Sequence, residues 1–384
     1  MTPPARLQAA AEILDAILAG QPAEQALSAW TRARRFAGSG DRAAIRDHVY
    51  DALRRKRSLA HLGGAMTGRG LIIGLAREAG AELSQIFTGA GHAPAALSEA
   101  EAMGPSAPMD ELVALDCPDW LAPALRDSLG PDFAQVMDAL RWRAPLFLRV
   151  NLARIGLEDA RAALAADGIT AVPHPLAPTA LEVTENARKV ARSAAYGAGL
   201  VELQDVSSQA VIAELPELGG ARVLDYCAGG GGKALAMAAR GAQVSAHDAS
   251  PARMRDLPAR AARAGAAITQ LDAPEGLFDL VLTDVPCSGS GSWRRDPEGK
   301  WRLTPDRLEA LIATQAGILT AAARHVRPGG QLCYVTCSLL DLENQSQIAR
   351  FLQHDSRFAL RHTHRLTPLQ GGDGFFLATL SQCP

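Results

Sequence analysis

Apolar side chains recur along this chain with two different periods. Near the start, Leu7, Ala11, Leu14 and Leu18 are spaced three or four residues apart, which is the spacing of one helix face. Patterns of this kind continue to about residue 140 and predict an all-helical region. Beyond it, short apolar runs alternate with helical patterns, as is typical of a parallel sheet covered by helices on both faces.

The change of period divides the chain into domains. A length of 384 residues is enough for two or three domains, each with a core of its own. In chain order we expect an all-helical domain at 1–75, a helical connecting region at 76–140, a small α/β subdomain at 141–200, and a main α/β domain at 201–384.

The main domain is predicted to place its polar residues at one edge of the sheet. Ligands of open α/β sheets bind outside the carboxyl ends of the strands. A glycine-rich loop, Asp248 and two cysteines, Cys287 and Cys337, all follow predicted strands. We therefore expect a binding site at this edge. The strands are predicted at Arg222–Tyr226, Gln243–His247, Ala267–Leu271, Phe278–Thr283 and Gln331–Thr336, with a late strand of the same sheet at Phe375–Leu380.

Composition limits where a nucleic acid could bind. Charged residues make up 21% of the chain and the formal net charge is -2, so any basic surface must be local. The stretch from Thr31 to Arg57 holds nine basic and three acidic residues. Its last four positions, Arg54, Arg55, Lys56 and Arg57, can either stabilise the end of a helix or contact RNA phosphates, and both interpretations stay open.

Cysteine use and hydropathy indicate a cytoplasmic protein. Six cysteines scattered over 384 residues do not suggest a disulfide framework. Residues 1–6 lead into an amphipathic helix and not into an apolar signal core. No segment approaches the roughly 18 to 20 apolar residues that cross a bilayer. We expect reduced thiols, no membrane partner and no metal site.

The glycine-rich loop, Gly229–Gly232, predicts a nucleoside site without phosphates. Its backbone can approach a ligand closely, and Asp248 at the next strand end can accept both ribose hydroxyls. A phosphate-binding P-loop would need glycine at Cys227 and Ser or Thr at Ala234. Asp272 ends the third strand, where it could bind the adenine amino group or cap a loop.

Cys287 and Cys337 are candidate nucleophiles for methylation of a pyrimidine. Carbon 5 of cytosine or uracil becomes reactive when a thiolate adds to carbon 6, and cysteine is suited to that addition because it ionises and leaves readily. A nearby carboxylic acid, for which Asp284 is the candidate, can draw in electrons. A second cysteine can act as acid or base during release. The other four cysteines are interpreted as core residues (Cys117, Cys333, Cys383) or as lining the cofactor (Cys227).

These residues form motifs that resemble a known family. Leu224–Lys233, Asp284–Gly291 and Thr336–Ser338 resemble the signature motifs of the RsmB/Sun (Fmu) RNA cytosine-5 methyltransferases. The resemblance covers roughly Leu146 to Leu380, including Arg149–Asn151, Gln204–Asp205 and Gly371–Phe376. The helical N-terminus is similar to the NusB-like domain of the rRNA-methylating branch.

The resemblance implies a Rossmann-like class I methyltransferase domain and assigns roles. Cys337 would be the nucleophile and Cys287 would assist release of the methylated base. Gly230 and Ala234 depart from the proline and threonine usual in the loop, so we expect weaker cofactor affinity at most. S-adenosylmethionine would be held by Cys227, Ala228, Gly229, Gly230, Gly231, Gly232, Lys233, Asp248, Asp272 and Asp284.

RNA, and small-subunit rRNA in particular, is the expected partner of a monomeric enzyme. An enzyme that works on a base must take it out of any stack. Trp293, Arg295, Lys300 and Trp301 mix stacking faces with charges that suit phosphates, although two tryptophans could simply anchor a solvated loop. The alternatives are the same chemistry on tRNA, or an idle RNA-binding assembly factor. The two cysteines argue against idleness, whereas the altered glycine loop leaves it open.

Overall fold

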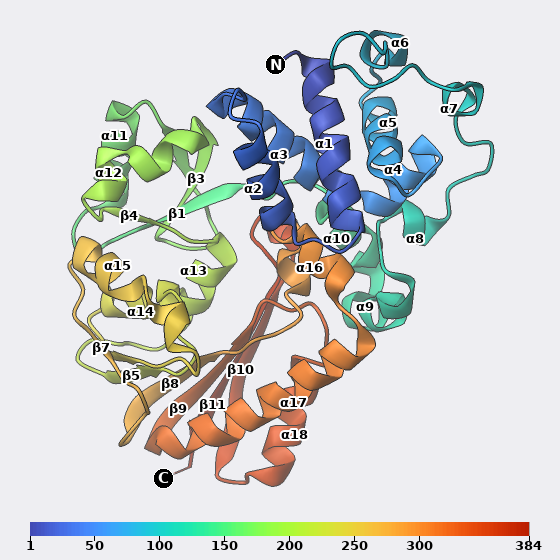
Figure 1. Cartoon of the computed structure of the whole chain (residues 1–384). Coiled ribbons are helices and arrows are strands. Elements are labelled where there is room, and N and C mark those ends of the chain that lie inside the picture. The colour runs from blue at the N-terminus through green and yellow to red at the C-terminus, as the bar shows by residue number, and fades with distance from the viewer. Residues whose placement is uncertain (384) are drawn as a thin grey trace. The chain divides into compact units, whose positions relative to one another are not determined.

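The computed structural model describes residues 1–383 and divides into two compact units. The first, called here the helical unit, comprises Met1–Arg143 and Trp293–Arg302. The second, the sheet unit, comprises Ala144–Ser292 and the chain from Leu303 onward. Figure 1 colours the chain by residue number. Within residues 1–383, no helix is both long enough and apolar enough to cross a membrane.

The helical unit is built around a core of alanine, leucine and isoleucine side chains. α1 begins after Thr2, whose hydroxyl accepts from the backbone N–H of Ala5. Gly74 allows α4 and α5 to approach closely, because a Cβ there would lie 2.1 Å from the Leu59 carbonyl oxygen. The helices are α1 Pro3–Leu18, α2 Ala23–Ala33, α3 Ser39–Arg54, α4 Lys56–Gly63, α5 Gly68–Glu78, α6 Leu83–Ile86, α7 Glu99–Met103, α8 Glu111–Ala114, α9 Ala122–Leu129, α10 Phe133–Ala139 and α16 Pro297–Arg302.

A four-stranded antiparallel sheet opens the sheet unit, in the order β2-β3-β1-β4. β1 pairs with both β3 and β4, and α11, Leu157–Ala166, contributes Ala160 and Leu164 to the core on one side of it. The strands are β1 Leu146–Val150, β2 Thr170–Pro173, β3 Ala180–Glu185 and β4 Val201–Leu203.

The main sheet has seven strands in the order β10-β11-β9-β8-β5-β6-β7. β5 to β9 run parallel, whereas β11 is antiparallel to β9 and β10 is antiparallel to β11. All six strands predicted for this sheet are present, with shifted ends, and β10 was not predicted. The strands are β5 Arg222–Asp225, β6 Gln243–Ala246, β7 Ile268–Gln270, β8 Phe278–Asp284, β9 Val326–Thr336, β10 Phe358–Leu366 and β11 Phe375–Gln382.

Helices cover both faces of the main sheet (Figure 1). α13, Val206–Ala213, and α14, Gly232–Ala238, pack on the face that carries Leu280 and Leu282. α17, Pro305–Ala322, and α18, Gln345–His354, pack on the face that carries Val281. Because successive strand residues point to opposite faces, one apolar run fills both cores. The expected α/β fold with a helical N-terminal region is confirmed.

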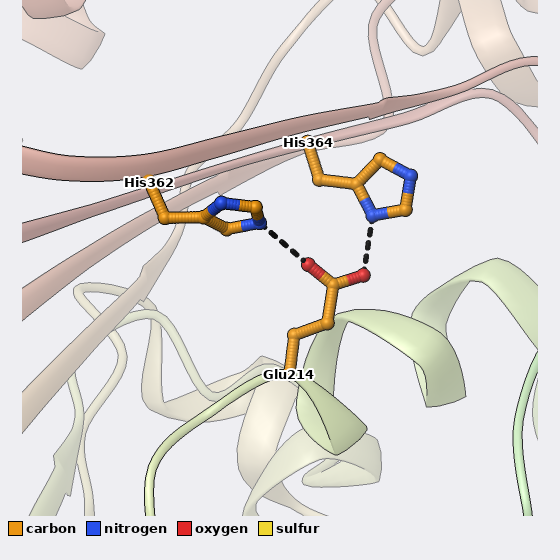
Figure 2. A group of neighbouring side chains, drawn as sticks. All are labelled: Glu214, His362 and His364. Atoms are coloured by element: carbon orange, nitrogen blue, oxygen red, sulfur yellow. Dashed lines mark hydrogen bonds and ion pairs between the residues drawn. The ribbon is translucent and has the colours of Figure 1, made fainter.

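The unpredicted strand β10 brings two histidines next to the end of α13. His362 and His364 lie on β10, and Glu214 follows the last residue of α13 (Figure 2). A bulge interrupts the pairing of β10 with β11 between Leu360 and His362. The bulge breaks the alternation of apolar and polar residues, which explains why the strand was not recognised in the sequence.

Candidate active site

The thiols of Cys287 and Cys337 are in contact. Cys287 follows β8 and Cys337 follows β9, and these strands are parallel neighbours, with Asp284 opposite Val335. The two Sγ atoms lie 3.4 Å apart. A separation of 50 residues in the chain thus becomes one contact at the carboxyl edge of the sheet, where the two cysteines were expected.

The surroundings of Cys287 favour its protonated form. The hydrogen bond to Cys337 raises the pKa of Cys287 well above its ordinary value, and burial and the charges of Cys337 and Glu343 raise it further. Cys287 therefore keeps its proton at neutral pH and can donate to a neighbouring sulfur.

Lys233 connects the glycine loop to the carboxyl end of β8. Its Nζ lies 2.6 Å from Oδ2 of Asp284, and its side chain is buried. Burial alone would lower the pKa of Lys233, but the charge of Asp284 and the hydrogen bond to it raise the value above the ordinary one. Lys233 therefore keeps its proton at neutral pH, and its contact with Asp284 holds the start of α14 against β8.

The glycine loop has a backbone that side chains would distort. Gly229 and Gly231 have φ values of 50° and 80°, in the left-handed region. A Cβ on Gly231 would lie 2.1 Å from Cδ1 of Leu257. Asp248 braces the loop, because its Oδ2 accepts from the backbone N–H of Gly229 at 3.0 Å.

Two arginines hold the carbonyl groups of the same loop. Arg149 donates to the Gly232 carbonyl at 2.7 Å and also to Gln204, and burial lowers the pKa of Arg149 to about 10. Arg260 donates to the Gly230 carbonyl. A Cβ on Gly230 would lie 2.8 Å from Nη1 of Arg260, so the glycine that departs from the family motif is packed against this guanidinium.

Asp225, the last residue of β5, is a site residue that our predictions did not include. Its side chain is buried, and neither carboxylate oxygen has a hydrogen-bond partner of good geometry. Burial raises the pKa of Asp225 to about 7, and the charge of Asp284 adds to the shift. Buried carboxylates are rarely left unpartnered, so one at the head of a glycine loop fits the cationic part of a ligand. The signal in the sequence was an acid at the end of a buried strand directly before the glycines.

Glu343 was also missed, and it joins the two cysteine-bearing loops. Oε1 accepts from the backbone N–H of Ser288 at 2.8 Å and from the amide of Gln315 at 2.9 Å. Oε2 accepts from the hydroxyls of Ser288 and Ser338. Ser288 follows Cys287 and Ser338 follows Cys337, so one buried carboxylate fixes the backbone beside both thiols.

The remaining residues that were predicted to bind the cofactor are Cys227, Ala228 and Asp272. Cys227 and Ala228 are in the loop itself, and burial raises the pKa of Cys227 above its ordinary value. Asp272 is exposed and lies beyond β7, the edge strand of the sheet. Cys333 is a core residue, as expected, and burial raises its pKa to about 12. The interpretation of Cys383 as a core residue is wrong, because its side chain is exposed.

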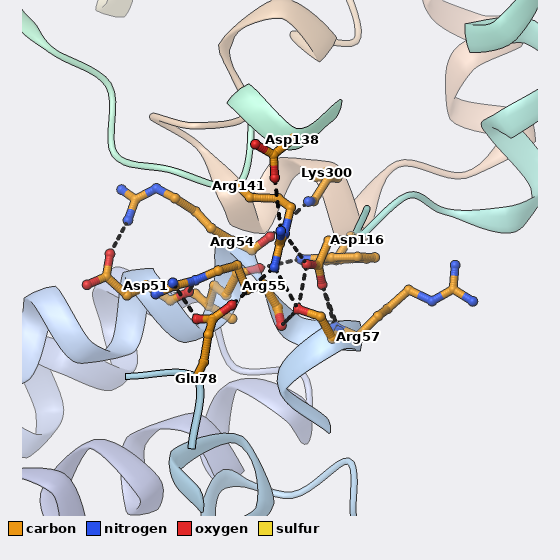
Figure 3. Close-up of polar contacts among 12 residues, drawn as sticks. Asp51, Arg54, Arg55, Arg57, Glu78, Asp116, Asp138, Arg141 and Lys300 are labelled. Atoms are coloured by element: carbon orange, nitrogen blue, oxygen red, sulfur yellow. Dashed lines mark hydrogen bonds and ion pairs between the residues drawn. The ribbon is translucent and has the colours of Figure 1, made fainter. Parts of the chain in front are cut away.

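Most of the residues predicted to contact RNA are buried or half-buried in the structure. Four of them have buried side chains, which are not accessible to RNA: Arg54, Arg55, Lys300 and Trp293. Figure 3 shows Arg54, Arg55 and Lys300 among their neighbours. Trp301 is half-buried and donates to the Leu53 carbonyl at 2.7 Å. Lys56 and Arg57 are half-buried as well, and of the predicted RNA-contacting residues only Arg295 is exposed.

Several of these basic residues have partners that are distant in the chain. Asp116, which is fully buried, accepts from the backbone N–H of Arg57 at 2.8 Å and from Arg141 at 3.0 Å (Figure 3). Arg55 pairs with Glu78 at 2.5 Å. Lys300 donates to the Arg54 carbonyl at 3.0 Å, and burial lowers the pKa of Lys300 to about 8, against the charge of Asp116. We call this network the ionic cluster. Its members are Arg54, Arg55, Arg57, Glu78, Asp116, Arg141 and Lys300.

Comparison with known proteins places the chain in one class. The fold and the glycine loop are those of Rossmann-like methyltransferases. The crystal structure of PH0851 superposes with a TM-score of 0.77 over 100% of this chain and 99% of that one, at 23% identity, which shows the common fold.

The chain belongs to the RsmB/F family of 16S rRNA methyltransferases. The family model matches residues 215–381, and the model of the ferredoxin-like domain of RsmF/B-like methyltransferases matches residues 117–190. Ribosomal RNA small subunit methyltransferase B of Xylella fastidiosa is 36% identical over 286 residues, 68% of each chain. The protein of the same name from Xanthomonas campestris is 39% identical over 249 residues, and the match spans 62% of this chain and 57% of that relative.

Proposed function

We propose that this protein is an S-adenosylmethionine-dependent RNA (cytosine-5)-methyltransferase that acts on small-subunit rRNA. The observation that carries the proposal is the contact of 3.4 Å between the thiols of Cys287 and Cys337, beside the glycine loop. Methyl transfer that needs no covalent enzyme–base adduct would need neither thiol. The printed names of the relatives support rRNA as the substrate.

The two thiols take different parts in the reaction. The Cys337 thiolate adds to C6 of the base, which makes C5 nucleophilic, and C5 gains a methyl group. After a base removes the C5 proton, the C6–S bond breaks and the thiolate of Cys337 departs. Cys287 keeps its proton because its pKa is raised, so it can stabilise the departing sulfur by donating to it. Asp284, held by Lys233, contacts the substrate or the cofactor.

The residues of the loop fit the proposed cofactor. Asp225 offers a buried carboxylate without a hydrogen-bond partner of good geometry to the cationic amino acid part of S-adenosylmethionine. Asp248 lies in the loop wall, where it can also accept ribose hydroxyls. Cys227, Ala228, Gly229–Gly232 and Lys233 line the same loop, and Asp272 would reach the adenine. When bound, the cofactor supplies the methyl group.

The helical unit would dock the RNA, as the NusB-like resemblance implies. Its basic residues at the ionic cluster do not support that role, because they are used internally. Arg295, which was predicted to contact RNA, is exposed and can still do so. The chain would work as a cytoplasmic monomer.

Product analysis tests the function. The purified protein would be incubated with labelled S-adenosylmethionine and a small-subunit rRNA transcript, and the digested nucleosides would be identified by mass spectrometry. We expect 5-methylcytidine from the unchanged protein and from Cys383→Ala, whose thiol is exposed at the end of the chain, but none from Cys337→Ala.

Two other outcomes identify the alternatives. Methylation of tRNA transcripts without methylation of rRNA would replace the substrate and keep the chemistry. Failure to bind S-adenosylmethionine in equilibrium dialysis would overturn the enzymatic proposal and favour an idle RNA-binding assembly factor.

A further inference from the structure

We call Cys287, Cys337, Glu343, Asp225 and the glycine loop the thiol site. Three other side chains converge on one point at the edge of the main sheet. Glu214 follows α13, and His362 and His364 lie two residues apart on β10 (Figure 2). One Glu214 oxygen lies 3.0 Å from Nε2 of His362, and the other contacts Nδ1 of His364. One ligand atom from each of the three residues can be chosen so that all lie within 4.8 Å of one another.

A β-bulge puts both histidines on the face that α13 covers. Before the bulge, Leu360 pairs with Leu380, which lies in the core under α17 and α18. After it, His364 pairs with Leu377, which lies in the opposite core, under α13 and α14. Because side chains alternate along a strand, a regular β10 would have turned both histidines away from Glu214. Bulges often re-aim a side chain in this way.

We propose that Glu214, His362 and His364 bind a divalent transition-metal ion of the borderline class, with Zn²⁺ as the leading candidate. Two imidazole nitrogens and one carboxylate oxygen suit Zn²⁺, Ni²⁺ or Co²⁺, whereas Mg²⁺ and Ca²⁺ select oxygen ligands. Metal bonds of about 2.0–2.2 Å in a tetrahedral site place ligand atoms roughly 3.3–3.6 Å apart. The ion would therefore replace the two hydrogen bonds between Glu214 and the imidazole rings, and small rotations of the exposed side chains supply the movement.

The side chains are accessible, so solvent completes the coordination. His362 is 55% exposed, His364 is 38% exposed and Glu214 is 27% exposed. A site of three protein ligands with one open position leaves room for a water molecule, as three-ligand zinc sites do. The geometry therefore needs no partner chain to fill the ion's coordination.

The bound ion would fasten an edge strand. β10 is the outermost strand at one edge of the main sheet, and an edge strand pairs on one side only. Glu214 is separated from His362 by 148 residues and from His364 by 150, so the ion would close a long loop between α13 and β10. Binding to the folded state alone raises thermal stability by mass action.

Zinc binding by the full chain tests the proposal. Isothermal titration with ZnCl₂ would be compared for the unchanged protein, His362→Gln, His364→Gln, Glu214→Gln and, as a matched control, His354→Gln, which changes an exposed histidine on α18. We expect one Zn²⁺ per chain in the unchanged protein and in the control. Each of the other three variants should bind at least about tenfold more weakly, since losing only the partner of a ligand already costs 10–100-fold.

Thermal melts and cobalt spectra distinguish this site from the cysteines. Without zinc, the three variants should have the same Tm as the unchanged protein, because the three side chains are exposed or half-buried. Zn²⁺ at about 100 times its Kd should raise the Tm by roughly 5 °C only where the three ligands are intact. Co²⁺ bound without a thiolate charge-transfer band supports the site. Absence of zinc binding, equal binding by the His362→Gln and His364→Gln variants, or a thiolate band that these variants keep would overturn it.

Discussion

The thiol site of the sheet unit and the ionic cluster of the helical unit are both buried and polar, yet their polar groups are arranged differently. In the ionic cluster each described charge has a partner: Asp116 accepts several N–H groups, and Arg55 faces Glu78. At the thiol site Asp225 has no partner of good geometry. The pKa of Lys300 is lowered in the first region, and the pKa of Asp225 is raised in the second.

The difference indicates which region is built for a ligand. A network in which every polar group has a partner stabilises a fold and leaves no polar group available for a ligand. An unsatisfied buried carboxylate costs stability unless something else binds it. Perturbed pKa values occur in both regions, so they do not by themselves identify the site. The partners do. Four substitutions separate the two regions further.

The largest expected effect is on catalysis, from Cys337→Ala. Loss of the nucleophile should lower the rate of methyl transfer by at least about 10⁴-fold, as in other enzymes that use a covalent intermediate. Stability should hardly change, because Cys337 contributes only part of its surface to a core. Initial rates and far-ultraviolet circular dichroism melts measure the two. Substantial residual transfer would show that another group attacks the base.

Asp116→Ala should have the largest effect on stability. Removing one partner of a buried ionic network costs about 3–5 kcal/mol. The substitution takes away one of the three carboxylates that pair with Arg141, and it leaves the buried N–H group of Ser58 without its acceptor. Asp119→Ala is the control, because that carboxylate is 69% exposed and pairs with Arg57 on the surface, where the loss is about 1 kcal/mol or less. Equal losses in the two variants would contradict the distinction.

Tryptophan fluorescence reports these losses for one unit only. All five tryptophans belong to the helical unit: Trp30, Trp120, Trp142, Trp293 and Trp301. Denaturant unfolding followed by fluorescence should therefore shift for Asp116→Ala, because Asp116 belongs to the same unit.

Glu343→Ala should have an intermediate effect. It leaves the N–H groups of Ser288 and Gln315 without acceptors, which costs about 1–3 kcal/mol and loosens both cysteine loops. Glu343→Gln is the matched control, because its amide oxygen can accept those two bonds and its NH₂ can donate to the hydroxyls that face Oε2. Methyl transfer should fall much further in the alanine variant. Equal rates would argue that Glu343 does not position the thiols.

The smallest effect concerns the pH dependence of the helical unit. The pKa of Lys300 is about 8 in the folded chain, below its ordinary value of 10.5, so the unfolded chain binds more protons between these values. Stability from this group should rise as pH increases from about 8 to 10.5. Lys300→Met should remove that part of the slope in fluorescence-monitored unfolding. An unchanged slope would show that Lys300 titrates normally.

The sequence placed the two cysteines and the glycine loop at one edge of the sheet because the signals for this are local. Strand ends, glycines and the two cysteines are recognised from neighbouring residues, and the parallel order of β8 and β9 brings them together. The partners in the ionic cluster could not be predicted, for the opposite reason. Nothing near Arg55 in the chain shows that Glu78 will face it or that Lys300 will be buried, so a run of positive charge suggested a surface.

The same limit explains the remaining omissions. Glu343 lies six residues after Cys337 without a motif of its own, and its function depends on Ser288 and Gln315 from two other segments. β10 was missed because the bulge beside Arg361 interrupts its period. Features that depend on pairing between distant segments were therefore the ones that local patterns could not predict.

Trapping of a covalent adduct tests the central claim most directly. Cys287→Ala, Cys337→Ala and the unchanged protein would each be mixed with small-subunit rRNA transcript and S-adenosylmethionine, then separated on denaturing gels. We expect Cys287→Ala to accumulate a protein–RNA adduct, because Cys337 still attacks and release is impaired, and we expect Cys337→Ala to form none. An adduct found only with Cys337→Ala would reverse the roles of the two thiols and contradict the account.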